Sequence, residues 1–526
     1  MPDSTKPNAV SVRYLSTKFL EEVKDSRGSR RLGRESKIYE IEDLSKDEYG
    51  VIRKKGVEKK SSYVDCLNGK DNVGEATHML SYSWGYTIGD IIDSLDHYCE
   101  NNEKDKKRTY EWICCLNVNQ HDVVKFRKEG KAVPFEDFSN EFYQRVKGIK
   151  HILAMMAPWK DPGYLERAWC VYEMFVATTS PECNVAIIMP PKEGNQLAKD
   201  IENGQGGNIV FQVLFQTNVE KAKTFPPCDK ERIMEEVNKC IELEALNSKI
   251  NKKRIDWIKS NLDEAIKERE EACSDSTDDN LSFARFLRKV GLLFYKQGYY
   301  IDAWMQQINA LNIQKRLLGE DDRQIAHTYN DIGLTYHELS KLKQKNDTGM
   351  TSDELKENAY ESCNKALQIR KKIFKDTMDE EAEKDVAASL CNVAMRLISR
   401  NDVDEAKEMA ELALEIRKEY EDPADMCRSE ITLGRVYAAG DDNSKAIEHF
   451  EVALDWLQKS EEDQRLKARV LYAKGKSYQK LEEKAKAVDA FKKCLVIRTQ
   501  IFGPDHKKNI EAKDKVEKLT SSKLDL

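Results

Sequence analysis

A carboxylate, two tryptophans and three short polar segments are the residues of this sequence best suited to chemistry. The segments are SWGY at 83–86, NVNQH at 117–121 and APWKDPG at 157–163. A carboxylate beneath a sugar can stabilise an oxocarbenium-like centre, and an aromatic face can position a leaving ring and exclude water. Glu173 is the candidate carboxylate, and Trp84 or Trp159 the candidate face. Ser83 and Gly85 lie in a segment whose backbone can approach a phosphate or a ribose closely.

Each candidate also has a purely structural explanation, which the sequence leaves open. Glu173 could be a solvated glutamate on a helix, and either tryptophan could close the end of a hydrophobic core. Asn119 is a candidate for the polar edge of a pocket, although an asparagine at the end of a strand often hydrogen-bonds its own backbone in a turn. His121 has no cysteine or aspartate partner at nucleophile spacing, which argues against a hydrolase triad.

Short apolar runs alternate with helical patterns from residue 76 to residue 191, and these elements must position the candidates. Strands are predicted at 77–84, 110–118, 151–158 and 184–191, and helices at 88–99, 138–148 and 165–178. Strands that are apolar throughout and separated by helices indicate a parallel sheet covered on both faces. The ligand crevice of such a sheet lies beyond the carboxyl ends of its strands, where all three polar segments are expected.

The α/β part of the sequence resembles a TIR-like domain, in the divergent form that is fused to repeats in many unicellular eukaryotes. The resemblance covers roughly residues 60–245 and is carried by THMLSYSWGYTIGDIIDSL (77–95), WICCLNVNQH (112–121), FYQRVKGIKHILAMMAPWKDPGYLERAWCVYEMFVA (142–177) and VEKAKTFPPCDKERI (219–233). It implies a flavodoxin-like fold, and it implies that Glu173 in the WCVYE block matches the glutamate that acts in NAD cleavage. One departure is an additional charged segment at 122–137, where TIR domains usually place a mobile assembly loop. Known TIR domains divide between NAD-cleaving enzymes and adaptors.

Residues 281–502 contain an internal repeat that is marked by small residues. Steps of 12 and 7 residues separate Gly291, Ala303 and Ala310, and the same steps begin again at Ala394, Gly434 and Gly475. Small residues at this spacing let the two helices of a hairpin approach closely, and such hairpins must stack to bury their apolar faces. The repeat led by Gly333 carries a 14-residue insertion between its two helices. The sequence therefore predicts an α-solenoid of about five helical hairpins.

The repeat spacing resembles that of tetratricopeptide repeats in the long form found in kinesin light chains. The segments LGEDDRQIAHTYNDIGLTYHEL (318–339) and IRTQIFGPDHKKN (497–509) look like the turns between hairpins of that family. The resemblance implies a concave surface that docks a protein or peptide ligand. A cargo adaptor of the kinesin-light-chain kind is disfavoured, because residues 233–270 keep no clean heptad pattern over three to four heptads.

The predicted organisation has five parts. These are a polar flexible segment at 1–60, the TIR-like α/β domain at 61–228, a helical connector and hinge at 229–280, the solenoid at 281–515 and a polar tail at 516–526. A net charge of −7 gives no reason to expect a nucleic-acid partner. There is neither a run of 18 apolar residues nor an apolar signal core, so no membrane span is expected. The 13 cysteines form no metal-like pairs, which favours a reducing, cytoplasmic location and no metal site.

Two functions are compatible with these features. In the first, the protein is an intracellular signalling effector whose solenoid docks a partner, while its TIR-like domain self-associates and cleaves NAD at the nicotinamide-ribose bond. NAD is then a substrate, and no cofactor is tightly bound. In the second, the protein is a non-catalytic adaptor or scaffold that uses both domains as docking surfaces. The orientation of Glu173 separates them, because a crevice beside Trp84 and Trp159 favours the enzyme and an open surface favours the adaptor.

Overall fold

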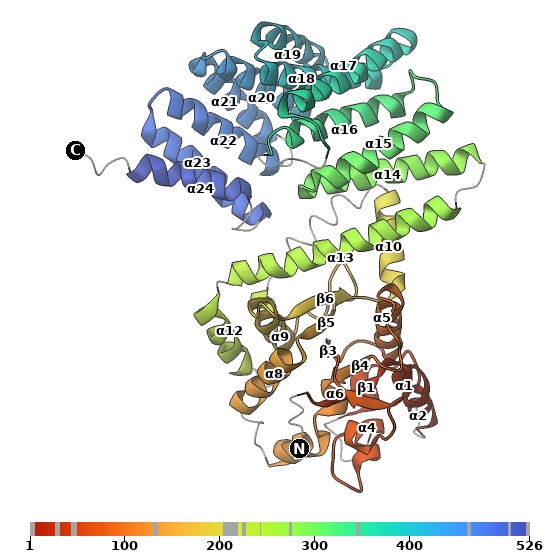
Figure 1. Cartoon of the computed structure of the whole chain (residues 1–526). Helices are drawn as coiled ribbons and strands as arrows, with labels where there is room; N and C mark the ends of the chain where they lie inside the picture. Colours follow the sequence, from red (N-terminus) through yellow and green to blue (C-terminus); the bar gives the residue numbers. More distant parts are fainter. Residues whose placement is uncertain are drawn as a thin grey trace. The chain divides into compact units, whose positions relative to one another are not determined.

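The chain divides into two compact units (Figure 1). The computed structural model describes residues 6–26, 32–43, 50–129, 135–203, 219–223, 228–241, 243–272, 276–342, 348–459, 464–502 and 507–521. The first unit comprises residues 1–199 and 208–265 and contains the sheet. The second comprises residues 200–207 and 266–526. The division falls inside the connector that the sequence predicts at 229–280.

A mixed sheet forms the centre of the first unit. Its six described strands are, in spatial order, β2 (Val73–Glu75), β1 (Asn8–Ser11), β4 (Tyr110–Ile113), β3 (His78–Ser81), β5 (His151–Met155) and β6 (Asn184–Ile188). Strands β4, β3, β5 and β6 are parallel, whereas β1 lies antiparallel to both β4 and β2. The prediction of a parallel sheet is therefore correct for four strands and wrong at the β4 edge. Within the parallel part, the strand order reverses between β3 and β5, which makes a topological switch point there.

Among the first 60 residues, those that the structure describes do not form the flexible lead-in that the sequence predicts. β1 pairs with β4 through Val10 and Glu111, and the chain continues into α1 (Val12–Tyr14) and α2 (Leu20–Asp25). Several apolar side chains of this segment are buried in the core, namely Val10, Val12, Leu15, Phe19, Leu20 and Val23. The many charged residues among them lower the average hydropathy, so composition conceals the apolar face.

Three helices confirm the predicted pattern around the sheet. They are α5 (Ile88–Asn101), α8 (Phe135–Ile149) and α9 (Ala168–Thr179). The strand predicted at 110–118 is wrong beyond Ile113, because α6 (Cys114–Asn117) follows directly. The side chain of Asn117 stabilises this change, since it accepts from the Ile113 amide at 2.9 Å and donates to the Asn8 carbonyl of β1 at 2.7 Å.

The connector predicted at 229–280 is helical over most of its described residues, but it is divided into α12 (Cys228–Cys240) and α13 (Leu243–Ala272). A further helix, α10 (Pro191–Glu202), follows β6 and was not predicted. Of the hinge predicted at 273–280, residues 273–275 lie outside the described residues, and a helix begins at Thr277.

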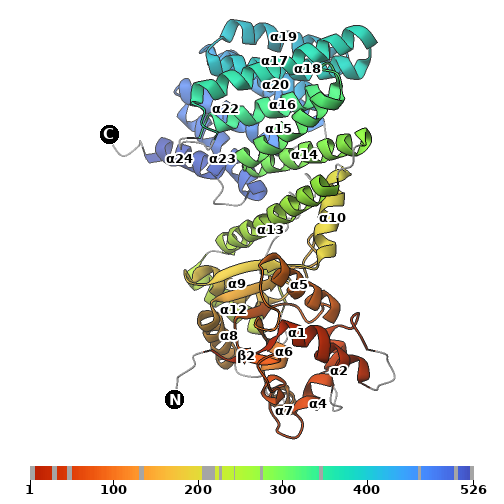
Figure 2. The same cartoon turned by 45° about the vertical axis from the view of Figure 1, so that its right-hand side comes forward.

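The second unit is a stack of helices in which each one packs against the next (Figure 2). The helices are α14 (Thr277–Gln297), α15 (Tyr300–Leu317), α16 (Arg323–Leu339), α17 (Ser352–Thr377), α18 (Glu380–Arg400), α19 (Val403–Lys418), α20 (Pro423–Ala439), α21 (Asn443–Lys459), α22 (Gln464–Lys480), α23 (Lys484–Phe502) and α24 (Lys507–Ser521). The pairs from α14/α15 to α22/α23 confirm the predicted hairpins. The polar tail predicted from residue 516 is wrong as far as Ser521, because α24 continues to that residue.

Small residues hold the helices of each hairpin close together, as the spacing predicts. A Cβ atom on Gly333 would lie 2.5 Å from the Cys363 sulfur and 3.0 Å from the Ala359 carbonyl oxygen. A Cβ atom on Gly434 would lie 2.5 Å from the ring of Phe450. Any larger side chain at either glycine would force the two helices apart. Within the described residues, no helix is both long and apolar enough to cross a membrane.

Candidate functional site

Glu173 lies on α9, a helix that is buried on nearly every side. The sequence AWCVYEMFVATT is apolar around most of its circumference, and every residue from Cys170 to Ala177 is buried. Glu173 itself is only 6% exposed. It therefore points neither to an open surface nor into an open crevice, the two arrangements that would have separated the candidate functions.

The Glu173 carboxylate is bound to the end of a neighbouring strand. Ser81, the last residue of β3, donates from its hydroxyl to Glu173 Oε2. The Tyr164 hydroxyl lies 2.8 Å from Ser81 Oγ and donates to the Cys170 carbonyl at 2.9 Å. Tyr86 holds Tyr164 from the other direction, because its hydroxyl accepts from the Tyr164 amide at 3.0 Å. This buried network lies at the carboxyl end of β3, beside the switch point of the sheet.

Burial has a large effect on the acidity of this carboxyl group. It raises the pKa of Glu173 to about 7, while the hydrogen bond from Ser81 and the charge of Arg167 act in the opposite direction. Arg167 directly precedes α9 and donates from Nη1 to the Tyr82 carbonyl at 3.3 Å. A carboxyl group that titrates near neutral pH at the ligand edge of a sheet is a functional-site candidate.

Of the other predicted site residues, Trp84 comes nearest to this network. Burial first and the charge of Glu173 second raise the pKa of the Cys114 thiol, and the Trp84 side chain is within hydrogen-bonding reach of the same thiol. Trp84 is half-buried and packs against the hydrophobic core. In the same loop, the amide of the exposed Gly85 donates to Ser83 Oγ at 3.4 Å.

Trp159 and Asn119 make their contacts elsewhere in the first unit. Trp159 is 2% exposed, its amide donates to Glu193 of α10 at 2.9 Å, and its carbonyl accepts from Arg254 of α13 at 2.9 Å. Asn119 caps α7 (Gln120–Lys128), because its Oδ1 accepts from the His121 amide at 3.1 Å. These contacts agree with the structural explanations of both residues, and a ligand role for either stays a prediction.

Ser81, Tyr164 and Arg167 lie around Glu173, and Ser81 and Arg167 act on its pKa, but no sequence pattern predicted these three residues. One signal was available for Ser81, because it places a hydroxyl group in the last position of a strand that otherwise ends in apolar residues. Arg167 lies six residues before Glu173, and no local pattern distinguishes it from a solvated arginine. Within the described ranges, no group of three or more His, Cys, Asp or Glu side chains could hold a metal ion.

In the second unit, a polar side chain links consecutive hairpins at a recurring position. It lies four residues after the third small residue of a repeat, and its partner lies five residues before the small residue that begins the next repeat. The linked pairs are Gln314 and Thr328 at 2.7 Å, Arg370 and Ser389 at 2.8 Å, and Arg417 and Ser429 at 2.9 Å. The repeat therefore supplies a buried hydrogen bond at three successive junctions.

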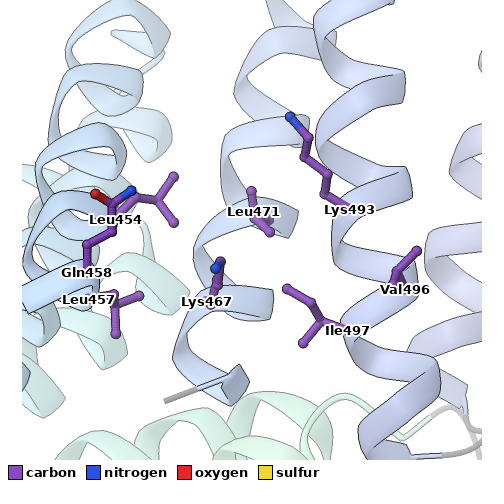
Figure 3. A pocket seen from close by; sticks show the side chains of 8 residues that line it. All are labelled: Leu454, Leu457, Gln458, Lys467, Leu471, Lys493, Val496 and Ile497. Atoms are coloured by element: carbon purple, nitrogen blue, oxygen red, sulfur yellow. The ribbon is translucent and has the colours of Figure 1, made fainter. Parts of the chain in front are cut away.

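The next junction has an apolar pair in place of this hydrogen bond, and a hollow of about 480 Å³ lies there (Figure 3). Leu457 and Val470 occupy the two corresponding positions and belong to one core cluster. The hollow is lined by residues of α21, α22 and α23, namely Leu454, Leu457, Gln458, Lys467, Leu471, Lys493, Val496 and Ile497. Its lining is mainly aliphatic, with lysines at its edge.

Comparisons with known proteins bear on the second unit. Two family models described as tetratricopeptide repeats match residues 386–421 and 425–500, which is less than half of the chain. These matches confirm the predicted repeat family for this part of the solenoid. No family match identifies the α/β unit as a TIR-like domain, and no curated protein matches the chain.

The solved structures that match this chain do so at low sequence identity and with TM-scores below 0.5. A putative kinesin light chain from Podosopora anserina, with nearly identical TPR-like repeats, is 15% identical with a TM-score of 0.31, and the match covers 41% of this chain and 94% of that one. The apo form of RapI is 19% identical with a TM-score of 0.36, covering 63% and 84%. A Rap protein in complex with competence and sporulation factor is 13% identical with a TM-score of 0.38, covering 62% and 86%. At these scores and identities, nothing about ligands or activities carries over.

Proposed function

We propose that this protein binds a protein or peptide ligand along the inner face of its tetratricopeptide solenoid. The observation that carries the proposal is that charges from distant hairpins act on one buried hydroxyl group. The charges of Arg396 on α18 and Arg469 on α22 both act on the hydroxyl of Tyr295 on α14, whose pKa burial raises. First helices of the first, third and fifth hairpins therefore face one another across the inside of a curved stack. Curved stacks of this kind present extended concave surfaces for binding.

The test is selection of peptide ligands on the full chain from a displayed library, followed by affinity measurements on matched variants. Lys476 on α22 is exposed, and the charge of Arg435 on α20 acts on it. Lys476→Glu is expected to weaken a selected ligand at least about tenfold, since it reverses a charge on the inner face. Lys418→Glu, an exposed lysine on the second helix of a hairpin, is the control and should leave affinity unchanged. Equal affinity in both variants would count against the inner face.

A second candidate function belongs to the first unit, and the position of Glu173 favours it. The order of the parallel strands, 2-1-3-4 in chain order, is that of a flavodoxin-like sheet without its last strand. Glu173 and Ser81 lie at the switch point of this sheet, where such folds bind ligands. In a TIR-like enzyme, the Glu173 carboxylate would accept from ribose hydroxyls of NAD and stabilise the positive charge that develops as nicotinamide leaves. Trp84 would supply the stacking face.

Access is the main requirement of this second function. With Glu173 only 6% exposed, a substrate reaches its carboxylate only after the chain that covers it moves. Self-association of the TIR-like domain is one event that could drive this movement. Cleavage is therefore expected at high protein concentration and not in dilute solution.

Release of nicotinamide from NAD by the full chain, at high concentration with a crowding agent, tests this function. Glu173→Gln is expected to abolish release, because an amide carries no charge to stabilise the reacting centre. Glu166→Gln removes an exposed carboxylate just before α9 and serves as the control. Absence of release from wild type would leave the first unit with a docking role, and equal release from wild type and Glu173→Gln would exclude this carboxylate.

A further inference from the structure

Two groups of arginines are found in the solenoid. The first group links hairpins: Arg370 donates to Ser389 and to the Asp385 carbonyl, and Arg417 donates to Ser429 and to the Asp425 carbonyl. In both links the guanidinium has a structural partner on the next helix. These arginines are therefore accounted for by the stacking of the repeats.

The second group consists of Arg396 on α18, Arg435 on α20 and Arg469 on α22, which we call the inner arginine cluster. Arg396 is 4% exposed, and its Nε and Nη1 have no hydrogen-bond partner among the described residues. Arg435 and Arg469 likewise make no hydrogen bond or ion pair within the described ranges. Burying the N–H groups of Arg396 without acceptors is costly, and a buried donor left unpaired commonly marks a site for a partner that is absent.

The positive charges of the three guanidinium groups act on one another. Burial, together with the charges of Arg469 and Arg396, lowers the pKa of Arg435 to about 9, whereas the charge of Glu338 opposes them. Glu338 is already paired with Lys341 at 2.9 Å. Glu338, the carboxylate that acts on both Arg396 and Arg435, thus already has a partner, and the three arginines leave an excess of positive charge here.

We propose that the inner arginine cluster binds the phosphate monoester of a phosphorylated peptide. This inference rests on the proposed docking function and names the chemistry of its ligand. A phosphate monoester is close to doubly charged at neutral pH and presents three acceptor oxygens, which matches several forked guanidinium donors. A single carboxylate offers two oxygens and one charge, and would leave most of the excess uncompensated. The peptide backbone would then follow the inner face across α18, α20 and α22.

The test uses an array of random peptides in matched triplets that carry phosphoserine, serine or glutamate at the same position. The labelled full chain is applied to the array, and affinities of the best triplets are measured in solution. Phosphoserine peptides are expected to bind at least about tenfold more tightly than their serine forms. Arg435→Gln and Arg469→Gln should each remove this preference.

Arg428→Gln is the matched control, because Arg428 lies on α20 like Arg435 but is 53% exposed and paired with Asp425 at 2.9 Å. Arg469 is exposed, so its replacement is compatible with folding, which circular dichroism would verify. Equal binding of all three peptide forms would overturn the phosphate proposal and leave the docking function standing. If inorganic phosphate or glycerol phosphate binds in a manner that depends on Arg435, while phosphoserine peptides bind no more tightly than serine peptides, the proposal that the ligand is a phosphorylated peptide is overturned. Absence of binding to any peptide would overturn both proposals.

Discussion

Two buried glutamates lie at opposite ends of the same sheet and differ in what surrounds them. Glu173 is at the carboxyl end of β3, with the Ser81 hydroxyl as donor and Arg167 nearby. Glu111 is near the amino end of β4, fully buried, and neither of its carboxyl oxygens has a hydrogen-bond partner in the described chain. Burial raises the pKa of Glu173 to about 7 and that of Glu111 to about 8.

The difference lies in how far each end of the sheet stabilises the ionised form of a carboxyl group. At the carboxyl end, a hydroxyl donor and a positive charge partly stabilise the ionised form, which a catalytic or ligand-binding carboxylate needs. At the amino end, His78 Nδ1 lies 3.5 Å from Glu111 Oε1, and burial lowers the pKa of His78 to about 3. The pair at the amino end is therefore neutral at pH 7, and its role is in packing and stability.

The largest expected effect comes from Glu111→Gln. Between about pH 4.5 and 8, the unfolded chain ionises this carboxyl while the folded chain keeps its proton, so the free energy of unfolding falls as pH rises. The substitution should raise the free energy of unfolding at pH 8, relative to pH 4.5, by roughly 4 to 5 kcal/mol compared with wild type. Urea unfolding followed by the fluorescence of the neighbouring Trp112 measures it.

The neighbouring His78 changes the pH range in which the effect of Glu111 on the free energy of unfolding is seen. Between about pH 3 and 6.5 the unfolded chain binds a proton on this histidine that the folded chain does not, so the contribution of His78 to stability rises with pH. In wild type it offsets one of the two glutamates between about pH 4.5 and 6.5, so the fall in the free energy of unfolding becomes steeper above that value. In Glu111→Gln, the rise caused by His78 and the fall caused by Glu173 should cancel below pH 6.5. Glu75→Gln, an exposed carboxylate on β2, is the control, and the same response in both variants would contradict the assignment.

Glu173→Gln is expected to give the second largest effect, over a narrower range. The folded pKa of about 7 restricts the loss of stability to about pH 4.5–7, with a total of roughly 3 kcal/mol at and above pH 7. The variant should lack the part of the fall in the free energy of unfolding that Glu173 causes between pH 4.5 and 7. From pH 7 to 8 its free energy of unfolding should change with the same slope as that of wild type, because Glu111 is the one of these two glutamates that still titrates there. A change of slope above pH 7 would mean that the two glutamates are coupled.

The same contrast shows what the sequence can and cannot predict. The WCVYE block located Glu173 on the correct helix, and alternating apolar runs located the four parallel strands, because both signals are local. The pairing of Val10 with Glu111 joins segments that are far apart in the sequence, so no local pattern indicated that β1 belongs to the sheet. For the same reason the partners of Glu173 were missed, since Ser81 and Glu173 meet only after the fold has formed. In the solenoid, small residues at fixed steps were sufficient because each contact is between neighbouring helices.

Ser81→Ala tests whether a single donor accounts for the lower pKa of Glu173. Without the hydroxyl, the ionised carboxylate loses its hydrogen bond, and the pKa of Glu173 should rise toward that of Glu111. The free energy of unfolding should fall by about 2 kcal/mol above pH 7 and change less at pH 4.5, where the carboxyl is protonated in both states. Ser83→Ala, two residues further on in the loop, is the control. A loss that is equal at both pH values would show that Ser81 acts through packing and not through the carboxylate.

Arg167→Gln is expected to have the smallest effect, because its charge is the weakest of the influences on Glu173. Removing the charge should extend the fall in stability to slightly above pH 7, by less than about one pH unit or 1.4 kcal/mol. The variant also loses the hydrogen bond to the Tyr82 carbonyl, which should cost stability at every pH. The effect of the Arg167 charge is seen only as a shift of the pH range over which the free energy of unfolding falls. Urea unfolding must therefore be measured across pH 5–9. Arg108→Gln, an exposed arginine paired with Asp71, should leave the range in place. If the range does not move in Arg167→Gln, Ser81 alone separates the two glutamates.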